Sequence, residues 1–405
     1  MDTSTSPAAQ SLDVVDVPLG PLVLGQVLPA VEAALRSGRA ILPVPERPAI
    51  VRDALLAALR PGMPVEAVDD DRVAFVVPTS GTTGEPKGVL LGAAAVAASA
   101  DATHSRLGGP GRWLLTLPAT HVGGLMVLAR SVVAGTEPDA VDLAGGFGPA
   151  PFAVAARRVI RNAARRCYTA LVPYQLAVLL DAGGAALETL TAFDAVLLGG
   201  SSSTPELLDR ARGAGVRVVT TYGMTETCGG CVYDGMPLDG VHVVTSGDGR
   251  ISIAGPMLAH GYRLQPHLTE QVFADGWFTS SDLGRIDPDG RLTVSGRVDD
   301  VAISGGVNVP LVAVDSLIAT HPGVTAVAAV ALPDPFWGQR VVAVLVPRDP
   351  RDPPTLESVR AHMARHAPQA HLPKALVLVP SLPTLSTGKV DRRTLVARLL
   401  ETTTV

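Results

Sequence analysis

Residues 76–91, VVPTSGTTGEPKGVLL, place a loop of glycines, hydroxyl residues and one lysine between two apolar runs. Hydroxyl groups can donate hydrogen bonds to phosphate, glycines let backbone amides come close, and lysine adds a positive charge. The residues concerned are Thr79, Ser80, Gly81, Thr82, Thr83, Gly84 and Lys87. The G-x-x-x-x-G-K-[ST] pattern does not fit, because Pro86 stands where it requires glycine. The loop therefore predicts a polyphosphate site of another kind, with Lys87 at the start of a helix; a plain strand-to-helix linker is the alternative.

Lysine is rare in this chain. Of 33 basic residues, only Lys87, Lys374 and Lys389 are lysine. A lysine is a compact charge on a flexible stem, suited to a phosphate or carboxylate that moves during a reaction. We expect a chemical role for Lys87 and Lys389, which both adjoin glycine, and only a strand-start charge for Lys374.

Short apolar runs alternate with helical patterns along the first 240 residues. Strands are expected at 71–78, 112–118, 168–173, 194–200 and 216–223. Helices are expected in the alanine-rich run from Gly92 and at 121–133 and 204–215. Because strands and helices alternate, the fold class is α/β, with mostly parallel sheets covered by helices.

The pattern changes after residue 240. Residues 241–256 and 284–296 carry Gly-Asp-Gly and Asp-Pro-Asp-Gly turns between alternating strands, which indicates a hairpin-rich antiparallel subdomain. Beyond it, helices at 312–323 and 356–368 and strands at 324–332 and 340–347 indicate a small α+β domain.

Composition and charge exclude several classes of protein. The net charge of −5 gives no basic surface for nucleic acid or anionic membranes. The uncharged stretch 88–100 is shorter than the roughly 20 residues of a spanning helix, and residues 1–10 lack a secretory pattern. Three cysteines do not make a disulfide framework. We expect a cytoplasmic protein whose partners are small molecules rather than nucleic acid or membranes.

Four ordered motifs resemble the adenylate-forming superfamily of acyl-CoA synthetases, luciferases and peptide-synthetase adenylation domains. They are TSGTTGEPKG at 79–88, YGMTET at 222–227, GWFTSSDLGRIDPDGRLTVSGRVDD at 276–300 and LPTLSTGKVDR at 382–392. The resemblance runs from about residue 73 to the end of the chain. It implies an adenylation domain at 1–298 that binds ATP and an acid, and a mobile C-terminal domain at 299–405.

The resemblance also implies an ATP site. Tyr222 would stack on adenine, Thr225 would touch the α-phosphate and Glu226 would hold Mg²⁺, a cation that prefers oxygen ligands. Further nucleotide contacts would come from Gly199, Gly200, Ser201, Gly223 and Met224. Asp282 would accept the ribose hydroxyls, with a further contact from Arg297. Each has a structural alternative: core packing for Tyr222, a helix cap for Glu226, a turn for Asp282, and a surface ion pair with Asp299 or Asp300 for Arg297.

Two half-reactions follow from the same resemblance. An acid and ATP would give an acyl-adenylate and pyrophosphate, and the thiol of CoA would then displace AMP. Lys389 would bridge the acid carboxylate and the α-phosphate in the first step. The C-terminal domain would then rotate about Asp299 as hinge, so that residues 304–308, SGGVN, line the thiol channel.

The chain resembles the o-succinylbenzoate:CoA ligases of menaquinone biosynthesis, in their short actinobacterial form, in three features. These are the short region before residue 79 and the stretches at 117–136 and 222–235. His121 would be catalytic and face the aromatic acid. Gly123, Gly124, Ser201, Gly229 and Gly230 would shape the acid pocket. Arg130 and His121 are candidates for binding the second carboxylate of this dicarboxylic acid, although His121 could instead only cap a helix.

Other assignments stay open at this point. Another aryl or medium-chain acyl-CoA synthetase would carry the same motifs, and a stand-alone adenylation enzyme would load a carrier protein instead of CoA. A homodimer is also left open. The C-x-x-C of Cys228 and Cys231 lacks a second ligand pair for zinc, so we expect two small buried residues.

Overall fold

The computed structural model describes residues 10–65, 71–80, 86–161, 166–384 and 390–403. The chain divides into two compact units. The N-terminal unit comprises Met1–Val243 and Ile253–Phe278, and the C-terminal unit comprises Val244–Ser252 and Thr279–Val405. The division passes within strands of the antiparallel region, and the domain boundary predicted between 298 and 299 stays a prediction.

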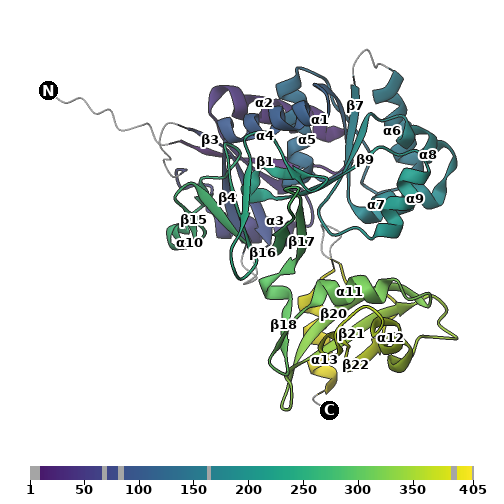
Figure 1. The fold of residues 1–405 in the computed structure, drawn as a ribbon. Helices are drawn as coiled ribbons and strands as arrows, with labels where there is room; N and C mark the ends of the chain where they lie inside the picture. Colours follow the sequence, from purple (N-terminus) through teal and green to yellow (C-terminus); the bar gives the residue numbers. More distant parts are fainter. Residues whose placement is uncertain (1–9, 66–70, 81–85, 162–165, 385–389, 404–405) are drawn as a thin grey trace. The chain divides into compact units, whose positions relative to one another are not determined.

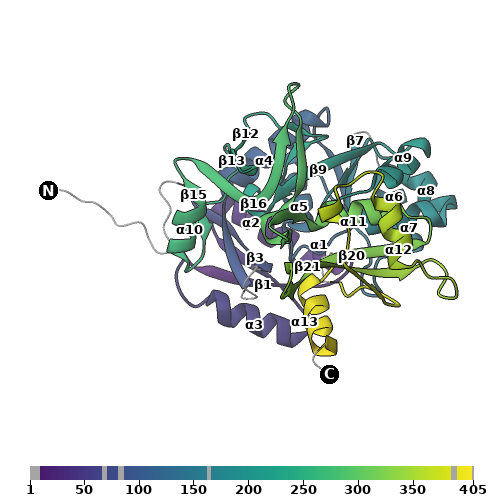
Figure 2. The same cartoon turned by 60° about the horizontal axis from the view of Figure 1, so that its bottom comes forward.

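A five-stranded sheet opens the N-terminal unit and has the order β1-β2-β3-β4-β14. Its strands are β1 (Leu12–Val17), β2 (Ala40–Pro45), β3 (Val73–Ser80), β4 (Pro86–Gly92) and β14 (Gly261–Tyr262). The helices between its first three strands are α1 (Leu22–Gln26), α2 (Leu28–Ser37) and α3 (Ala49–Leu59). Helix α3 packs against β2 and β4 and is visible in the turned view of Figure 2.

One prediction for this sheet is wrong. Lys87 does not begin a helix but lies on β4, opposite Thr79 of the antiparallel neighbour β3. The apolar residues 89–91 that follow are buried and continue the strand, and helix α4 (Ala93–Arg106) begins only at the alanine run. The phosphate loop therefore joins two paired strands, a geometry that the apolar pattern alone could not separate from a strand-to-helix turn.

The second sheet has seven strands in the order β11-β10-β9-β8-β7-β5-β6. Its strands β7 and β9 are labelled in Figure 1. Its members are β5 (Gly111–Leu115), β6 (Asp139–Ala140), β7 (Arg166–Leu171), β8 (Ala195–Leu198), β9 (Val218–Met224), β10 (Gly229–Tyr233) and β11 (Met236–Pro237). From β6 to β9 all neighbours are parallel, whereas β10 runs antiparallel to β9. The predicted α/β class with mostly parallel sheets is confirmed.

Helices cover both faces of this sheet. Side chains of α6 (Pro149–Arg161), α7 (Pro173–Ala182), α8 (Gly184–Thr191) and α9 (Pro205–Gly213) share one hydrophobic core with Leu114 of β5. The preceding residue, Trp113, points to the opposite face, because side chains alternate along a strand. There Trp113 meets α4 and α5 (Val122–Ala134). The two faces of β5 therefore contact different helix pairs.

The antiparallel region and the small α+β region occur where they were predicted. The first has β12 (His242–Thr245), β13 (Arg250–Ala254), β15 (Phe273–Ala274), β16 (Trp277–Ile286) and β17 (Leu292–Arg297), with α10 (Pro266–Val272). The second has β18 (Val301–Ser304), β19 (Val307–Pro310), β20 (Val324–Asp334), β21 (Gly338–Pro347) and β22 (Ala375–Leu378). Its helices are α11 (Leu311–Ala319), α12 (Leu356–Met363) and α13 (Arg392–Thr403).

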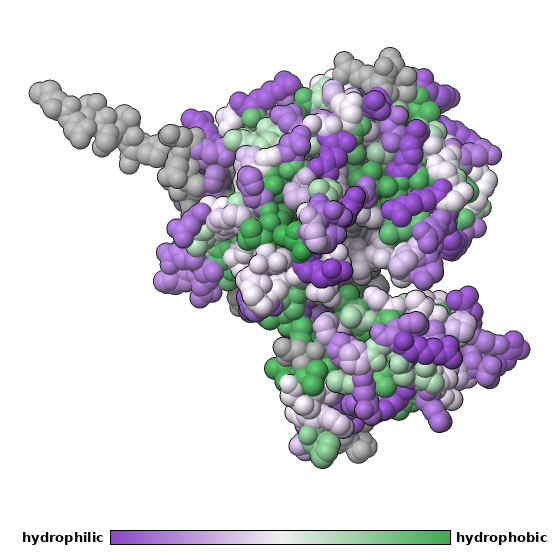
Figure 3. All heavy atoms as spheres, viewed as in Figure 1, coloured by the Kyte–Doolittle hydropathy of each residue, from purple (hydrophilic) through white to green (hydrophobic). Residues whose placement is uncertain are grey.

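Hydrophilic and hydrophobic residues are interspersed on the face of the N-terminal unit drawn in Figure 3. Large apolar side chains are exposed at separated positions of this unit, among them Leu22 and Ile50. Within the described part of the chain, none of the helices combines the length and the hydropathy needed to cross a bilayer.

Candidate active site

The hairpin of β3 and β4 frames the predicted phosphate loop. Gly81, Thr82, Thr83 and Gly84 lie outside the described residues. At the base of the hairpin, the hydroxyl of Thr79 donates to the carbonyl of Lys87 over 3.5 Å, and Ser80 pairs with Pro86. The Lys87 ammonium lies 5.5 Å from the centre of the Tyr262 ring. The lysine is therefore directed towards β14.

Strands β8 and β9 bring the residues predicted for the nucleotide together. The two strands are parallel neighbours, so Gly199, which follows β8, lies beside the carboxyl end of β9. A Cβ atom at Gly199 would come within 2.3 Å of the Thr221 hydroxyl oxygen, so this position admits no side chain. Gly200 and Ser201 continue the exposed turn, and Tyr222 is partly exposed on β9. In open α/β sheets, ligands bind at the carboxyl ends of such strands.

A one-turn helix carries Thr225 and Glu226 directly after β9. This turn, η1 (Thr225–Thr227), is fixed by the Thr227 hydroxyl, which donates to the carbonyl of Gly229 over 2.7 Å. The Glu226 carboxylate accepts a hydrogen bond of 2.8 Å from the Tyr262 hydroxyl. Glu226 thus engages a side chain of β14, which differs from the helix-cap alternative. Gly223 and Met224 pair with Gly230 and Gly229 of β10.

The oxygen chemistry at Glu226 fits Mg²⁺. A second acidic or histidine ligand is not needed, because Mg²⁺ usually keeps water molecules and is held by one or two carboxylates plus substrate phosphates. Among the described residues there is no group of three or more His, Cys, Asp or Glu side chains that could form an all-protein metal cage. Glu226 would therefore share the ion with phosphate oxygens.

Tyr262 and Arg263 form a junction that the sequence did not reveal. Tyr262 is buried and contacts both Lys87 and Glu226. Arg263 is only 1% exposed, and its guanidinium donates to four carbonyls at the end of α3. The sequence AHGYR has no spacing signal for these contacts, since every partner is distant along the chain.

Helix α5 carries the residues predicted for the acid. His121 occupies its N-cap position with extended backbone, and its side chain makes no capping hydrogen bond, which contradicts the capping alternative. A Cβ atom at Gly124 would lie 2.4 Å from the Pro118 carbonyl oxygen, so glycine lets α5 start close to β5. At Gly123 the same atom would meet only a Leu117 methyl group at 3.2 Å.

Arg130 is the buried charge of this helix. It is 3% exposed, and its Nε atom has no hydrogen-bond partner among the described residues. The guanidinium carbon lies 5.2 Å from the Trp113 ring centre. Its Nη2 atom would be 3.9 Å from a Cβ atom built at Gly229, so the guanidinium reaches the glycines of β10. The structure thus brings together Arg130 and the predicted pocket residue Gly229, whereas a Cβ atom at Gly230 would meet Tyr233 and Thr221.

Asp282 and Arg297 face each other within the C-terminal unit. They are register partners on β16 and β17, and Arg297 Nη1 lies 3.5 Å from Asp282 Oδ1. Asp282 is thus one partner of Arg297, and the surface pair with Asp299 or Asp300 considered from the sequence stays an open alternative. Asp299 belongs to a single turn, η2 (Val298–Asp300), between β17 and β18. Lys389 lies outside the described residues; the bridge between Thr384 and Val390 brackets its segment.

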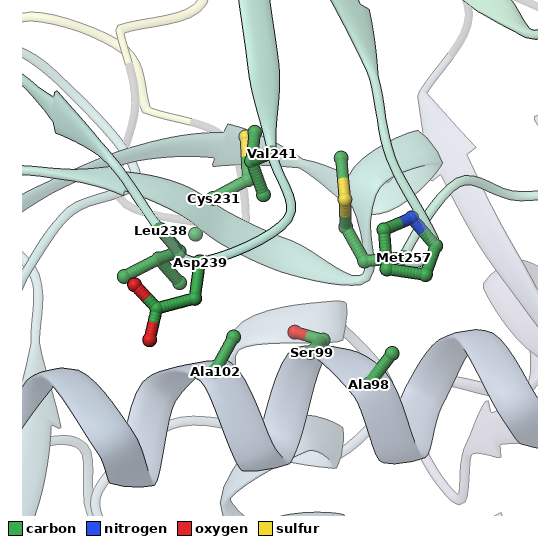
Figure 4. A pocket seen from close by; sticks show the side chains of 10 residues that line it. Ala98, Ser99, Ala102, Cys231, Leu238, Asp239, Val241 and Met257 are labelled. Carbon is green, nitrogen blue, oxygen red and sulfur yellow. The ribbon is translucent and has the colours of Figure 1, made fainter.

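A hollow beside α4 includes Gly230 in its lining but no other residue of the predicted site. It has about 210 Å³ of space free of atoms, partly open to solvent, between α4 and the strands above it (Figure 4). Its lining is mostly apolar, and the one carboxylate, Asp239, accepts a hydrogen bond from Ser105. Cys231 on this wall and the adjacent Cys228 are buried, as predicted. Burial raises the pKa of Cys231 to about 12 and that of Cys228 further, so both remain thiols.

Comparisons with known proteins give a consistent result. The sequence matches the AMP-binding enzyme family over residues 26–263 and the AMP-binding enzyme C-terminal domain over residues 313–389. It is 47% identical over 375 residues to the probable 2-succinylbenzoate–CoA ligase of Mycobacterium tuberculosis (strain ATCC 25618 / H37Rv), covering 92% of this chain and 94% of the relative.

Solved structures agree at the level of the fold. The o-succinylbenzoate CoA synthetase (MenE) from Bacillus subtilis in complex with the acyl-adenylate intermediate OSB-AMP has a TM-score of 0.80 and 24% identity, covering 96% of this chain and 88% of that one. The same enzyme in complex with ATP and magnesium has a TM-score of 0.79 and 23% identity, covering 95% and 90%.

Proposed function

Because the chain belongs to the AMP-binding enzyme family, we propose that it is an ATP-dependent acid:CoA ligase acting on o-succinylbenzoate, which is another name for 2-succinylbenzoate. The reaction forms an acyl-adenylate with release of pyrophosphate, and CoA then displaces AMP to give o-succinylbenzoyl-CoA. The high identity to a probable 2-succinylbenzoate–CoA ligase over nearly the whole of both chains supports this substrate.

The observation that carries the substrate assignment is the environment of Arg130. A guanidinium is always charged, and burying it without an opposite charge costs several kcal/mol. Among the described residues no carboxylate forms an ion pair with Arg130 and its Nε has no hydrogen-bond partner, so no opposite charge in that part of the chain compensates the cost. A bound carboxylate would. The substrate has two carboxylates, and Arg130 binds the one that does not react, while His121 at the start of α5 faces the acid.

The nucleotide end of the site follows the motif assignments. Tyr222 stacks on adenine beside the turn of Gly199, Gly200 and Ser201, and Asp282 with Arg297 binds the ribose. Thr225 contacts the α-phosphate. Mg²⁺, held by Glu226, neutralises phosphate charge when it is bound. Tyr262 orients the Glu226 carboxylate through its 2.8 Å hydrogen bond, and its ring lies under Lys87, which reaches for the outer phosphates.

Adenylation brings two anions together, the acid carboxylate and the α-phosphate. We assign Lys389 to this step, because a cation placed between them stabilises the charge that builds up during attack. Thioester formation requires the lysine to leave and a thiol to enter. Asp299 is the proposed hinge, and its place in a single turn between two strands suits a few residues that absorb a large backbone rotation.

The proposed substrate also indicates the pathway and the cellular compartment. o-Succinylbenzoyl-CoA formation is a step of menaquinone biosynthesis, so we place the protein in that pathway. Its co-substrates ATP and CoA are metabolites of the cytoplasm, where we expect the enzyme to work.

A thioester assay tests the proposal. The protein is incubated with MgATP, CoA and, in turn, o-succinylbenzoate, benzoate, octanoate and amino acids, and the products are identified by mass spectrometry. We expect a CoA adduct with o-succinylbenzoate alone. Lys389→Ala should abolish its formation from ATP but still convert a supplied acyl-adenylate. A CoA adduct only with another acid would overturn the substrate, and adenylate without any CoA adduct would overturn the acceptor.

A further inference from the structure

Three buried side chains form a row behind the proposed acid pocket. The indole Nε1 of Trp113 donates a 3.4 Å hydrogen bond to Nε2 of His104, and the Arg130 guanidinium lies over the ring of the same tryptophan. They come from three elements, α4, β5 and α5, that the chain folds together. All are less than one-tenth exposed. Of the residues predicted for the acid, Trp113 contacts Arg130, and His104 follows behind Trp113.

The electrostatics of the row are well defined. Burial and the nearby Arg130 charge lower the pKa of His104 to about 4, so the imidazole is neutral at physiological pH. A neutral ring that accepts at Nε2 must carry its proton on Nδ1. Neutrality is what the row requires, because an imidazolium would lose the acceptor for Trp113 and add a like charge beside Arg130.

Trp113 itself has little freedom. It is fully buried, its ring centre lies 5.0 Å from that of Tyr168, and the Tyr168 hydroxyl donates 2.8 Å to the carbonyl of Gly109. The indole is thus fixed at its edge by His104 and packed against a second anchored ring. A guanidinium over such a fixed aromatic face is attracted to it, most strongly where water is excluded.

We infer that Trp113 and His104 are positioning residues that set the selectivity for a second carboxylate, by holding the Arg130 guanidinium towards Gly229. Arginine has a long flexible side chain, and among the described residues no ion pair fixes this one. The indole supplies the restraint without neutralising the charge, which an acidic partner would do. This inference rests on the proposed function.

The position of Gly229 supports the direction of the charge. A Cβ atom there would be 3.7 Å from Met126, 3.9 Å from Arg130 Nη2 and 4.0 Å from Val122. Gly229 also has φ of +89°, which a side chain would strain. The glycine therefore leaves room beside the guanidinium, where a carboxylate oxygen can take its place.

The test is the ratio of the kcat/KM values for two substrates. Values of kcat/KM are measured for 2-succinylbenzoate and for 4-oxo-4-phenylbutanoate, which keeps the succinyl chain but lacks the ring carboxylate. For Trp113→Phe, which keeps an aromatic face but loses the indole donor, we expect the ratio to fall about tenfold. The loss should lie in KM for the dicarboxylate, with kcat for the monocarboxylate within about twofold of the parent protein.

A second pair of variants distinguishes a loss of selectivity from a loss of folding. His104→Leu removes the acceptor of the Trp113 bond and should lower the ratio several-fold, whereas His104→Gln offers an amide oxygen in its place and should restore most of it. Phe152→Leu, in the core on the other face of the sheet, is the matched control: it should lower thermal stability and leave the ratio unchanged.

The two proposals fail in different ways. If Trp113→Phe and His104→Leu reduce activity on both acids equally, or leave the ratio unchanged, the positioning role is wrong although the ligase function stands. If the parent protein forms no thioester with 2-succinylbenzoate, the proposed function itself fails. A ratio that falls equally in His104→Leu and His104→Gln would also contradict the role of the hydrogen bond to Trp113.

Discussion

The region at the end of α3 and the region between α5 and β10 each bury one arginine, and their chemistry is opposite. Arg263 donates to the carbonyls of Leu59, Arg60, Met63 and Pro64 at 2.6 to 3.1 Å. Arg130 is equally enclosed, yet its Nε has no partner within the described residues. In the described part of the chain, the Arg263 guanidinium therefore has four backbone acceptors, whereas the Nε atom of Arg130 has none.

This difference assigns a structural role to Arg263 and a binding role to Arg130, although both are buried arginines. Two carbonyls at the C-terminus of α3 and two in the loop that follows stabilise a cation, so Arg263 contributes to folding. An uncompensated buried cation lowers stability and is retained where it binds something. The exposed fractions of the two arginines are similar and do not distinguish their roles. Their hydrogen-bond partners do.

The strongest test of the comparison is Arg263→Met. This change leaves four buried carbonyls without their donor, and we expect the free energy of unfolding to fall by about 3–5 kcal/mol. Chemical denaturation followed by circular dichroism measures it. Arg263→Lys, which keeps the charge but not the fork of donors, should lose nearly as much. Unchanged stability in both variants would contradict the structural role.

Arg130→Met should give the reverse pattern. We expect kcat/KM for 2-succinylbenzoate to fall about a hundredfold, roughly 3 kcal/mol, because the substrate loses a buried charge partner. Stability should be unchanged or higher, since an uncompensated charge is replaced by an apolar group of similar length. Steady-state kinetics and the same denaturation experiment provide both values. A stability loss like that of Arg263→Met would remove the distinction between the two sites.

Acid should affect the two regions differently. The pKa of His104 is lowered from its ordinary 6.5 to about 4 by burial and by Arg130, with a small opposing effect of Asp101. Between these values the unfolded chain binds a proton that the folded chain does not. The contribution of His104 to the free energy of unfolding should therefore be constant well above pH 6.5 and fall by roughly 2–3 kcal/mol as the pH drops towards 4.

The variant His104→Gln isolates this contribution. Its loss of stability between pH 6.5 and pH 4 should be smaller than that of the parent protein, because it lacks the titrating group. The carbonyl partners of Arg263 do not titrate. The free energy of unfolding of Arg263→Met should therefore change with pH as it does in the parent protein. Parallel curves for His104→Gln and the parent protein would exclude His104 as the source.

The smallest predicted effect concerns adjacent residues. Tyr262→Phe removes the hydroxyl that donates to Glu226 and should slow adenylation about five- to tenfold, near 1 kcal/mol, while thioester formation from supplied adenylate is unaffected. Pyrophosphate release and single-turnover thiolysis separate the two steps. Stability should change far less than in Arg263→Met, although the two residues are neighbours. Equal slowing of both steps would place Tyr262 outside the adenylation site.

The sequence predicted the α/β class, the parallel strands β5, β7, β8 and β9 and the small C-terminal region, because their apolar runs are bounded by clear turn signals. It placed Lys87 on a helix, because a buried strand and the start of a buried helix share the same apolar pattern. Motif resemblance identified Tyr222 and Glu226, and the chemistry of a dicarboxylic acid pointed to Arg130.

The partners of these residues could not be found in that way. Tyr262 contacts Glu226, and Trp113 contacts Arg130, across strands and helices that only the fold brings together. Neither tyrosine nor tryptophan stands in a pattern that marks it. Long-range pairs of this kind depend on sheet order, and the order of non-consecutive strands leaves no local trace in the sequence.

The contacts made by residues 260–263 can form only late in the synthesis of the chain. The Arg263 side chain binds carbonyls made 199 to 204 residues earlier, and His260 binds Asp71, 189 residues before it. At about 5–20 residues per second, a ribosome needs at least roughly ten seconds to cover that interval. During this time β4 lacks its partner β14 and an open strand edge is available for wrong pairing. Nascent chains stalled before residue 260 should therefore be the form of this protein that depends most on chaperones.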